Sequence, residues 1–145
     1  GFAGSIGARF AIPHGTVCGA LMAETNRLIL ERLKGTPGEN YYRAKYAAVG
    51  KLFARQAGNK SDVYFAGLLI DRLLEMTEIL RIPRLSDYGI TSEHFPFLAG
   101  KTSNKNNPVP FSTDDLMKIL ERSNGRKNPT LNKPDGIASN HQKTN

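Results

Sequence analysis

Metal ligation is the chemistry that the histidines of this sequence could support, and there are three of them: His14, His94 and His141. A zinc or iron site takes about three or four ligands from His, Cys, Asp or Glu that converge on one point. Neither His94 nor His141 has a motif spacing to His14. On the residues alone, His14 is a candidate ligand, and a half-buried histidine that hydrogen-bonds within the fold is the commoner alternative. His94, beside a helix cap, is expected to face solvent.

A helix is expected to hold His14 at its N-terminus. Ile12 precedes a proline and so favours an extended conformation, and Pro13 suits the first helical position, where a missing N–H costs nothing. His14 then lies in the first turn, where the helix dipole favours the neutral ring that a divalent metal requires. We predict that this helix runs from Pro13 to about Leu33.

The first half of this helix has the composition of a buried element. Residues 17–23 are apolar or small on all sides, which is typical of a helix surrounded by others. Gly15, Gly19 and Ala23 share one face at four-residue spacing, so a neighbouring backbone could approach there. The one cysteine, Cys18, is expected to be a buried, inert hydrophobe. A single cysteine excludes an internal disulfide and agrees with a reducing cytoplasm.

Hydrophobic periodicity predicts further helices around the central one. Breaks fall at residues 35–38 and at Pro83, and Ser112 is a candidate helix cap. No strand pattern is convincing, so the predicted fold is all-α, a bundle-like domain of about five to six helices around a buried central helix. The expected packing faces are Gly1, Gly4, Gly7 and Ala8; Tyr42, Tyr46, Val49 and Phe53; Val63, Ala66, Gly67, Ile70, Leu73, Leu74, Thr77 and Leu80; Phe95, Phe97 and Leu98; and Leu116, Ile119 and Leu120.

Size and composition indicate one globular domain followed by a tail. The chain has 145 residues, of which 39% are hydrophobic and 23% charged, and we place the domain at residues 1–123. From residue 124 onward Gly, Pro, Asn, Lys and Ser dominate, so residues 124–145 are predicted to be a flexible, disordered basic tail. No apolar run approaches the ~20 residues that a membrane span needs, and no secretion signal is present.

The positive charge of the chain raises a nucleic-acid-binding hypothesis. The formal net charge is +7, but residues 124–145 contain four basic side chains and one acidic one. The other basic residues are spread among acids, with no basic block interleaved with aromatics. We interpret most of them as solvated helix faces and keep nucleic-acid binding as a second hypothesis. A non-catalytic helical interaction domain is a third.

The glycines at the start of the chain do not form a nucleotide-binding loop. A dinucleotide fingerprint needs G-x-G-x-x-G after a hydrophobic strand, whereas Gly1, Gly4 and Gly7 recur every three residues with no strand before them. We interpret this stretch as the end of a tightly packed helix, left uncapped and apolar by a cut through it.

About five motifs follow one another along residues 1–123. They are Pro13-His14-Gly15 opening an apolar helix that ends near Asn26; Tyr46-Ala47-Ala48-Val49-Gly50; Leu80-Arg81-Ile82-Pro83 with Leu85, Gly89 and Ile90; Asn107-Pro108-Val109-Pro110; and the Thr113-Asp114-Asp115 helix. Each motif alone is a weak indicator of a family, whereas all of them in this order are a more specific one. In this order the chain resembles the C-terminal helical domain of iron-containing alcohol dehydrogenases.

The resemblance implies part of an oxidoreductase that interconverts alcohols and aldehydes by hydride transfer with NAD(P). In that family the active site lies in a cleft between an N-terminal nucleotide-binding domain and this helical domain. One aspartate and three histidines hold Fe²⁺ or sometimes Zn²⁺, and the last of these histidines maps to His14. The other three ligands would precede Gly1, and Gly4 stands where many members have a second histidine. His14 would therefore be a metal ligand, with no acid–base role.

From this resemblance we expect a piece of a cytoplasmic enzyme, with the N-terminal domain and a small alcohol or aldehyde as partners and a homodimer as a common assembly. Alone, the chain is expected to bind neither metal nor NAD(P) well and to be inactive. Without its partner domain, an apolar face near Phe2, Ile6 and Val17 would be exposed.

Overall fold

The computed structural model describes residues 1–55, 58–104 and 106–125. These residues form six α-helices and two short 3-10 helices and contain no strand, which confirms the predicted all-α class. The tail predicted at residues 124–145 lies, from residue 126 onward, outside the described residues. The helices are α1 (Phe2–Gly7), α2 (His14–Leu33), α3 (Glu39–Lys51), α4 (Asp62–Ile79), η1 (Leu85–Tyr88), η2 (Ser92–His94), α5 (Phe95–Lys101) and α6 (Thr113–Asn124).

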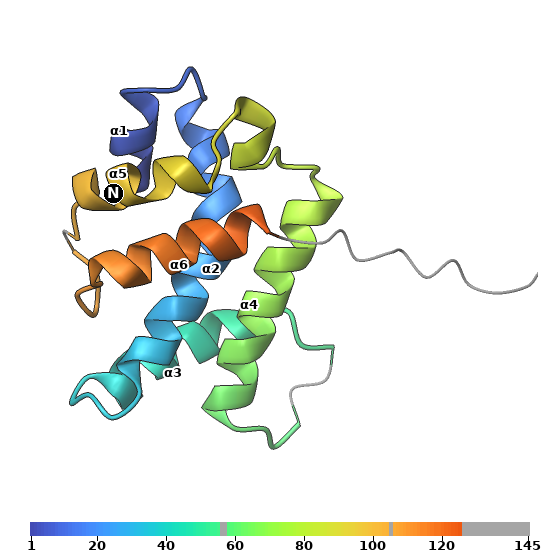
Figure 1. The fold of residues 1–145 in the computed structure, drawn as a ribbon. Helices are drawn as coiled ribbons and strands as arrows, with labels where there is room; N and C mark the ends of the chain where they lie inside the picture. Colours follow the sequence, from blue (N-terminus) through green and yellow to red (C-terminus); the bar gives the residue numbers. More distant parts are fainter. Residues whose placement is uncertain (56–57, 105, 126–145) are drawn as a thin grey trace, which may run out of the picture.

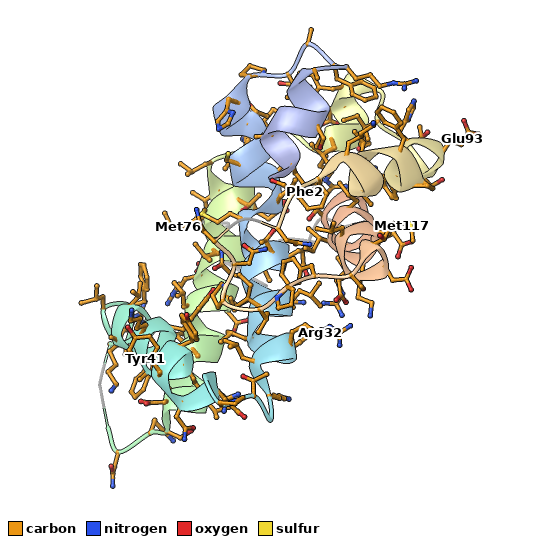
Figure 2. The ribbon with its side chains drawn as sticks, turned by 90° about the vertical axis from the view of Figure 1, so that its left-hand side faces the viewer. Phe2, Arg32, Tyr41, Met76, Glu93 and Met117 are labelled. Atoms are coloured by element: carbon orange, nitrogen blue, oxygen red, sulfur yellow. The ribbon has the colours of Figure 1, made fainter. Side chains whose placement is uncertain are left out.

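The long helix α2 is the axis on which the others pack (Figure 1). Helix α1 lies beside its first half, α6 crosses it, α3 lies beside its second half, and α5 packs on α1 and α6. Helix α4 contacts α2 and packs most extensively against α3. Figure 2 shows the α3–α4 pair on one side of α2 and α1, α5 and α6 on the other. Among the described residues, no helix combines the length and the hydropathy that a membrane crossing requires.

One hydrophobic core fills the space between α1, α2, α5 and α6. Its most deeply buried side chains include Ile6, Leu28, Leu98 and Ile119, each with 0% of its surface exposed. Burying an aliphatic side chain of this size stabilises the fold by ~1.5–3 kcal/mol relative to leaving it in water. The core therefore fixes α2 against α1 and α6.

The start of α6 follows the predicted capping chemistry. The backbone N–H of Asp115 donates to Ser112 Oγ at 3.1 Å, and the N–H of Ser112 donates to Asp115 Oδ2 at 3.2 Å. This reciprocal pair satisfies backbone donors that the first turn of a helix leaves without partners. The predicted helix start at Ser112 is thus confirmed.

The central helix is confirmed in its extent, with corrections at its start and on one face. Pro13 is the residue before the first turn, with φ −56° and ψ 135°, so the helix begins at His14. The expectation that α2 is buried on all sides is wrong, because Cys18 and Met22 are exposed. The small-residue face is also not a backbone contact. A Cβ at Gly19 would meet the Ile82 side chain, and one at Gly15 would meet nothing within 4 Å.

The sequence predicted only in part which residues of α3 and α4 face the core. Helix α3 buries Ala47 and Gly50, while Val49, expected in the core, is 44% exposed. Likewise Val63 and Leu80 of the predicted α4 face are 60% and 64% exposed. Of the residues predicted for that face, Ala66, Ile70 and Thr77 are buried, and Phe65 and Leu69, which the prediction missed, are buried with them.

The apolar face expected to be exposed near Phe2, Ile6 and Val17 is buried. Phe2 is 9% exposed, Val17 is 1% exposed and Ile6 is fully covered. They are covered because α1 folds back onto α2 and α5. The glycines of α1, expected to pack tightly, have room around them: a Cβ at Gly4 or Gly7 would meet nothing within 4 Å.

Candidate metal ligand at the end of a pocket

A pocket of about 490 Å³ runs along the exposed side of α2. Helix α2 lines it with His14, Cys18, Met22 and Asn26, which recur every four residues and therefore share one face. The remaining wall comes from the start of α1 and from the loop before α6. The apolar part of the lining consists of Phe2, Ala3, Val17, Leu21, Met22, Phe111 and Leu116.

His14 is the first residue of α2 and is exposed at one end of this pocket. The segment that leads to it is held in place on both sides. Ile12 is 7% exposed, the Phe10 ring meets the His94 ring edge-on at 5.1 Å, and the Arg9 guanidinium lies 4.9 Å from the centre of the Phe97 ring. The imidazole of His14 is therefore presented to the pocket from an anchored backbone.

His94 belongs to this anchor and not to the pocket. It is half-buried, which corrects the expectation that it faces solvent, because its ring packs against Phe10. Its Nδ1 accepts the backbone N–H of Thr91 at 3.1 Å. His141 lies outside the described residues. Among the described residues, the structure therefore does not bring His94 to the pocket beside His14.

The described residues do not hold a complete metal site. No three side chains of His, Cys, Asp or Glu type come together among them. The one other such side chain that lines the pocket beside His14 is Cys18, one turn further along α2. An exposed imidazole that lines a pocket suits a metal ligand, and the other ligands would have to come from elsewhere.

The opposite end of the α2 face is polar. Asn26 lines the pocket there, and its amide is fixed by two hydrogen bonds: Tyr46 donates from its hydroxyl to Oδ1 at 2.7 Å, and Nδ2 donates to the Met22 carbonyl at 2.7 Å. Burial raises the pKa of Tyr46 to about 12. The phenol therefore stays protonated near neutral pH and remains a donor.

Sequence reasoning found His14 but missed Cys18, Met22 and Asn26 as lining residues. The signal was present, because positions 14, 18, 22 and 26 are separated by four residues each. It was hidden by the surrounding apolar residues, which suggested burial on every side. The loop wall, which includes Ser103, Asn104 and Asn107, carries no local signal, because the fold alone brings it to α2.

Comparison with known proteins identifies the fold. A crystal structure of 1,3-propanediol oxidoreductase superposes with a TM-score of 0.70 and 21% sequence identity, over 84% of this chain and 31% of that chain. At this identity the likeness establishes the fold, and the chain spans about a third of the length of that protein. No curated protein sequence matches the chain. The family model described as "Fe-containing alcohol dehydrogenase family, C-terminal" matches residues 2–124. The chain therefore belongs to the Fe-containing alcohol dehydrogenase family and represents its C-terminal domain.

Proposed function

We propose that this chain is the helical domain of an NAD(P)-dependent alcohol dehydrogenase and that His14 is one ligand of its divalent metal. The observation that carries the proposal is the position of His14, an exposed lining residue of the pocket, in a chain whose family is shown. The family match does not favour the nucleic-acid-binding or interaction-domain alternatives.

The proposal divides the active site between two domains. An N-terminal nucleotide-binding domain supplies NAD(P), and the remaining metal ligands come from outside the described residues, which hold no set of three. When bound, Fe²⁺ or Zn²⁺ supplies a Lewis acid that stabilises negative charge on the oxygen of the alcohol or aldehyde. His14 contributes a neutral nitrogen ligand. The chain alone is expected to bind neither metal nor nucleotide well.

The test joins this chain to an upstream segment that carries a glycine-rich nucleotide-binding loop and an Asp/His/His ligand set. We expect stoichiometric metal and alcohol-dependent reduction of NAD(P) in the joined protein. Replacing His14 by Ala should abolish reduction and lower metal content, because a site that has lost one ligand of four holds its metal weakly. Metal is measured by elemental analysis after dialysis, and reduction by nicotinamide absorbance.

The matched control is His141→Ala, which removes another histidine of the chain. It should leave both metal content and turnover unchanged. Stoichiometric metal that survives His14→Ala would overturn the ligand assignment. A joined protein that binds metal but reduces neither nucleotide with any primary alcohol would overturn the proposed activity.

A further inference from the structure

The pocket has a second polar end whose chemistry the metal does not explain. His14 and Asn26 are the first and last residues of α2 that line it. They are twelve positions apart in the sequence, which corresponds to roughly 18 Å along the helix at 1.5 Å per residue. The intervening lining residues of α2 include Val17, Leu21 and Met22, so the floor between the two ends is largely apolar.

The amide of Asn26 is held in one orientation by residues from two helices. Tyr46 on α3 donates to its Oδ1, and its Nδ2 donates to the Met22 carbonyl one turn back on α2. The reversed amide would place its oxygen against the Met22 carbonyl, so that two acceptors would face each other. The Met22 contact therefore defines which end of the amide is the nitrogen, and the Tyr46 hydroxyl holds the oxygen end in place.

This arrangement leaves hydrogen-bonding capacity at the pocket. A primary amide has two N–H donors and an oxygen with two lone pairs. One N–H is used by Met22 and one lone pair by Tyr46, which leaves one donor and one acceptor site. Asn26 is half-buried and lines the pocket, so a ligand that reaches this end can use them.

We propose that Asn26 is a specificity-determining subsite for the distal polar group of the substrate, and that Tyr46 is the positioning residue that orients its amide. The substrate class is then an aliphatic alcohol or aldehyde with a second hydroxyl or carbonyl group far from the reacting carbon. The inference rests on the proposed function in taking this pocket as the substrate site. It adds a selectivity that a metal ligand at His14 does not supply.

The test measures selectivity on the chain itself, without metal or nucleotide. The ¹⁵N-labelled chain is titrated with octanol and, separately, with α,ω-octanediol, and dissociation constants are obtained from NMR shifts. We expect the diol to bind about twofold to tenfold more tightly than octanol, the range that one net hydrogen bond supplies. The side-chain amide signals of Asn26 should shift with the diol and not with octanol.

Variants separate a subsite from a merely structural residue. Asn26→Leu should reduce the diol-to-octanol preference to about one while retaining octanol binding. Tyr46→Phe should also reduce the preference, because it removes the donor that orients the amide. The control is Tyr42→Phe. Tyr42 lies on the same helix, is also half-buried and packs its side chain against the core. This control should preserve the preference, and circular dichroism should confirm that each variant is folded.

Three results would overturn the inference: equal affinities in the unmodified chain, no binding of either compound, or a preference that survives Asn26→Leu. These outcomes are independent of the metal. If the chain shows no diol preference while the joined protein still binds metal through His14, only the Asn26 subsite is overturned. An intact diol preference with no metal or turnover in the joined protein overturns the proposed function alone.

Discussion

Asp115 is the residue in which local and long-range interactions of this domain meet. Its carboxylate accepts the Ser112 N–H at the start of α6 and also accepts Arg32 Nε from α2 at 2.9 Å. The side chain of Asp115 is 7% exposed, whereas that of Arg32 is 44% exposed. The hydrogen bond from Arg32, more than any other contact, lowers the pKa of Asp115, and burial of the carboxylate opposes that shift.

The pH dependence of stability follows from the sign of this shift. Because the folded-state pKa of Asp115 is below its unfolded value, the carboxylate stabilises the fold above the unfolded pKa and ceases to do so as the pH falls through the folded one. We expect Asp115→Asn to lower the free energy of unfolding by about 1–2 kcal/mol near neutral pH, since a charged hydrogen bond is lost and its partner is half-exposed. The difference should shrink in acid, which urea titrations at several pH values would measure.

Asp114 is the matched control for this prediction. It precedes Asp115 in the first turn of α6 but is exposed. Asp114→Asn should change the unfolding free energy by a few tenths of a kcal/mol, through the helix dipole alone. Equal losses in the two variants, or a loss at Asp115 that does not vary with pH, would contradict the role assigned to the Arg32 contact.

Among the elements, α3 and α4 make the tightest crossing. A Cβ built at Gly50 would lie 1.9 Å from the Phe65 carbonyl oxygen and 2.7 Å from its carbon, so the two backbones touch at this point. Only a residue without a side chain fits there. The close approach explains why α3 packs through Ala47 and Gly50 and leaves Val49 exposed.

Substitution of this glycine should separate the two helices. We expect Gly50→Ala to lower the free energy of unfolding by about 1–3 kcal/mol, because the added methyl group meets backbone that cannot rotate away. Urea-induced unfolding followed by circular dichroism would measure the loss.

Gly67 on α4 provides the opposite control. A Cβ there meets nothing within 4 Å, so Gly67→Ala should raise stability by up to about 1 kcal/mol through the better helix propensity of alanine. If Gly50→Ala were as well tolerated as Gly67→Ala, the close crossing of α3 and α4 would be wrong.

At the scale of the whole molecule, burial is distributed unevenly over the helices. The core cluster draws its buried members from α1, α2, α5, α6 and the segments between them, and none of them lies on α3 or α4. Helix α3 buries only Ala47 and Gly50, while α6 buries five residues, including Leu116, Ile119 and Leu120. The α3–α4 pair is thus attached to the side of a core to which it contributes only the partly buried side chains of Tyr42 and Tyr46 (Figure 2).

This distribution predicts the order of local opening. Few buried apolar contacts lower the free energy needed to open a segment. We expect amide hydrogen exchange to be fastest, among the long helices, in α3 and slowest in the middle of α2 and in α6. Hydrogen exchange followed by NMR would measure this, and α3 amides as protected as those near Leu28 would contradict it.

The sequence by itself determined where the helices begin and end and which residue could ligate a metal. These features follow from local chemistry: Pro13 ahead of α2, Ser112 capping α6, and breaks near Gly35 and Pro83. The order of short motifs along the chain also predicted the family, which is shown over residues 2–124.

Only the tertiary structure decided which faces those helices turn toward one another. Periodicity fixes the spacing of apolar residues, but in a helix that is apolar all round it does not fix which side meets a neighbour. The packing partners leave the Cys18 and Met22 side of α2 open, and this side became the pocket. The contact of Tyr46 with Asn26 joins residues 20 positions apart on two helices, so it exists only once α3 has packed beside α2.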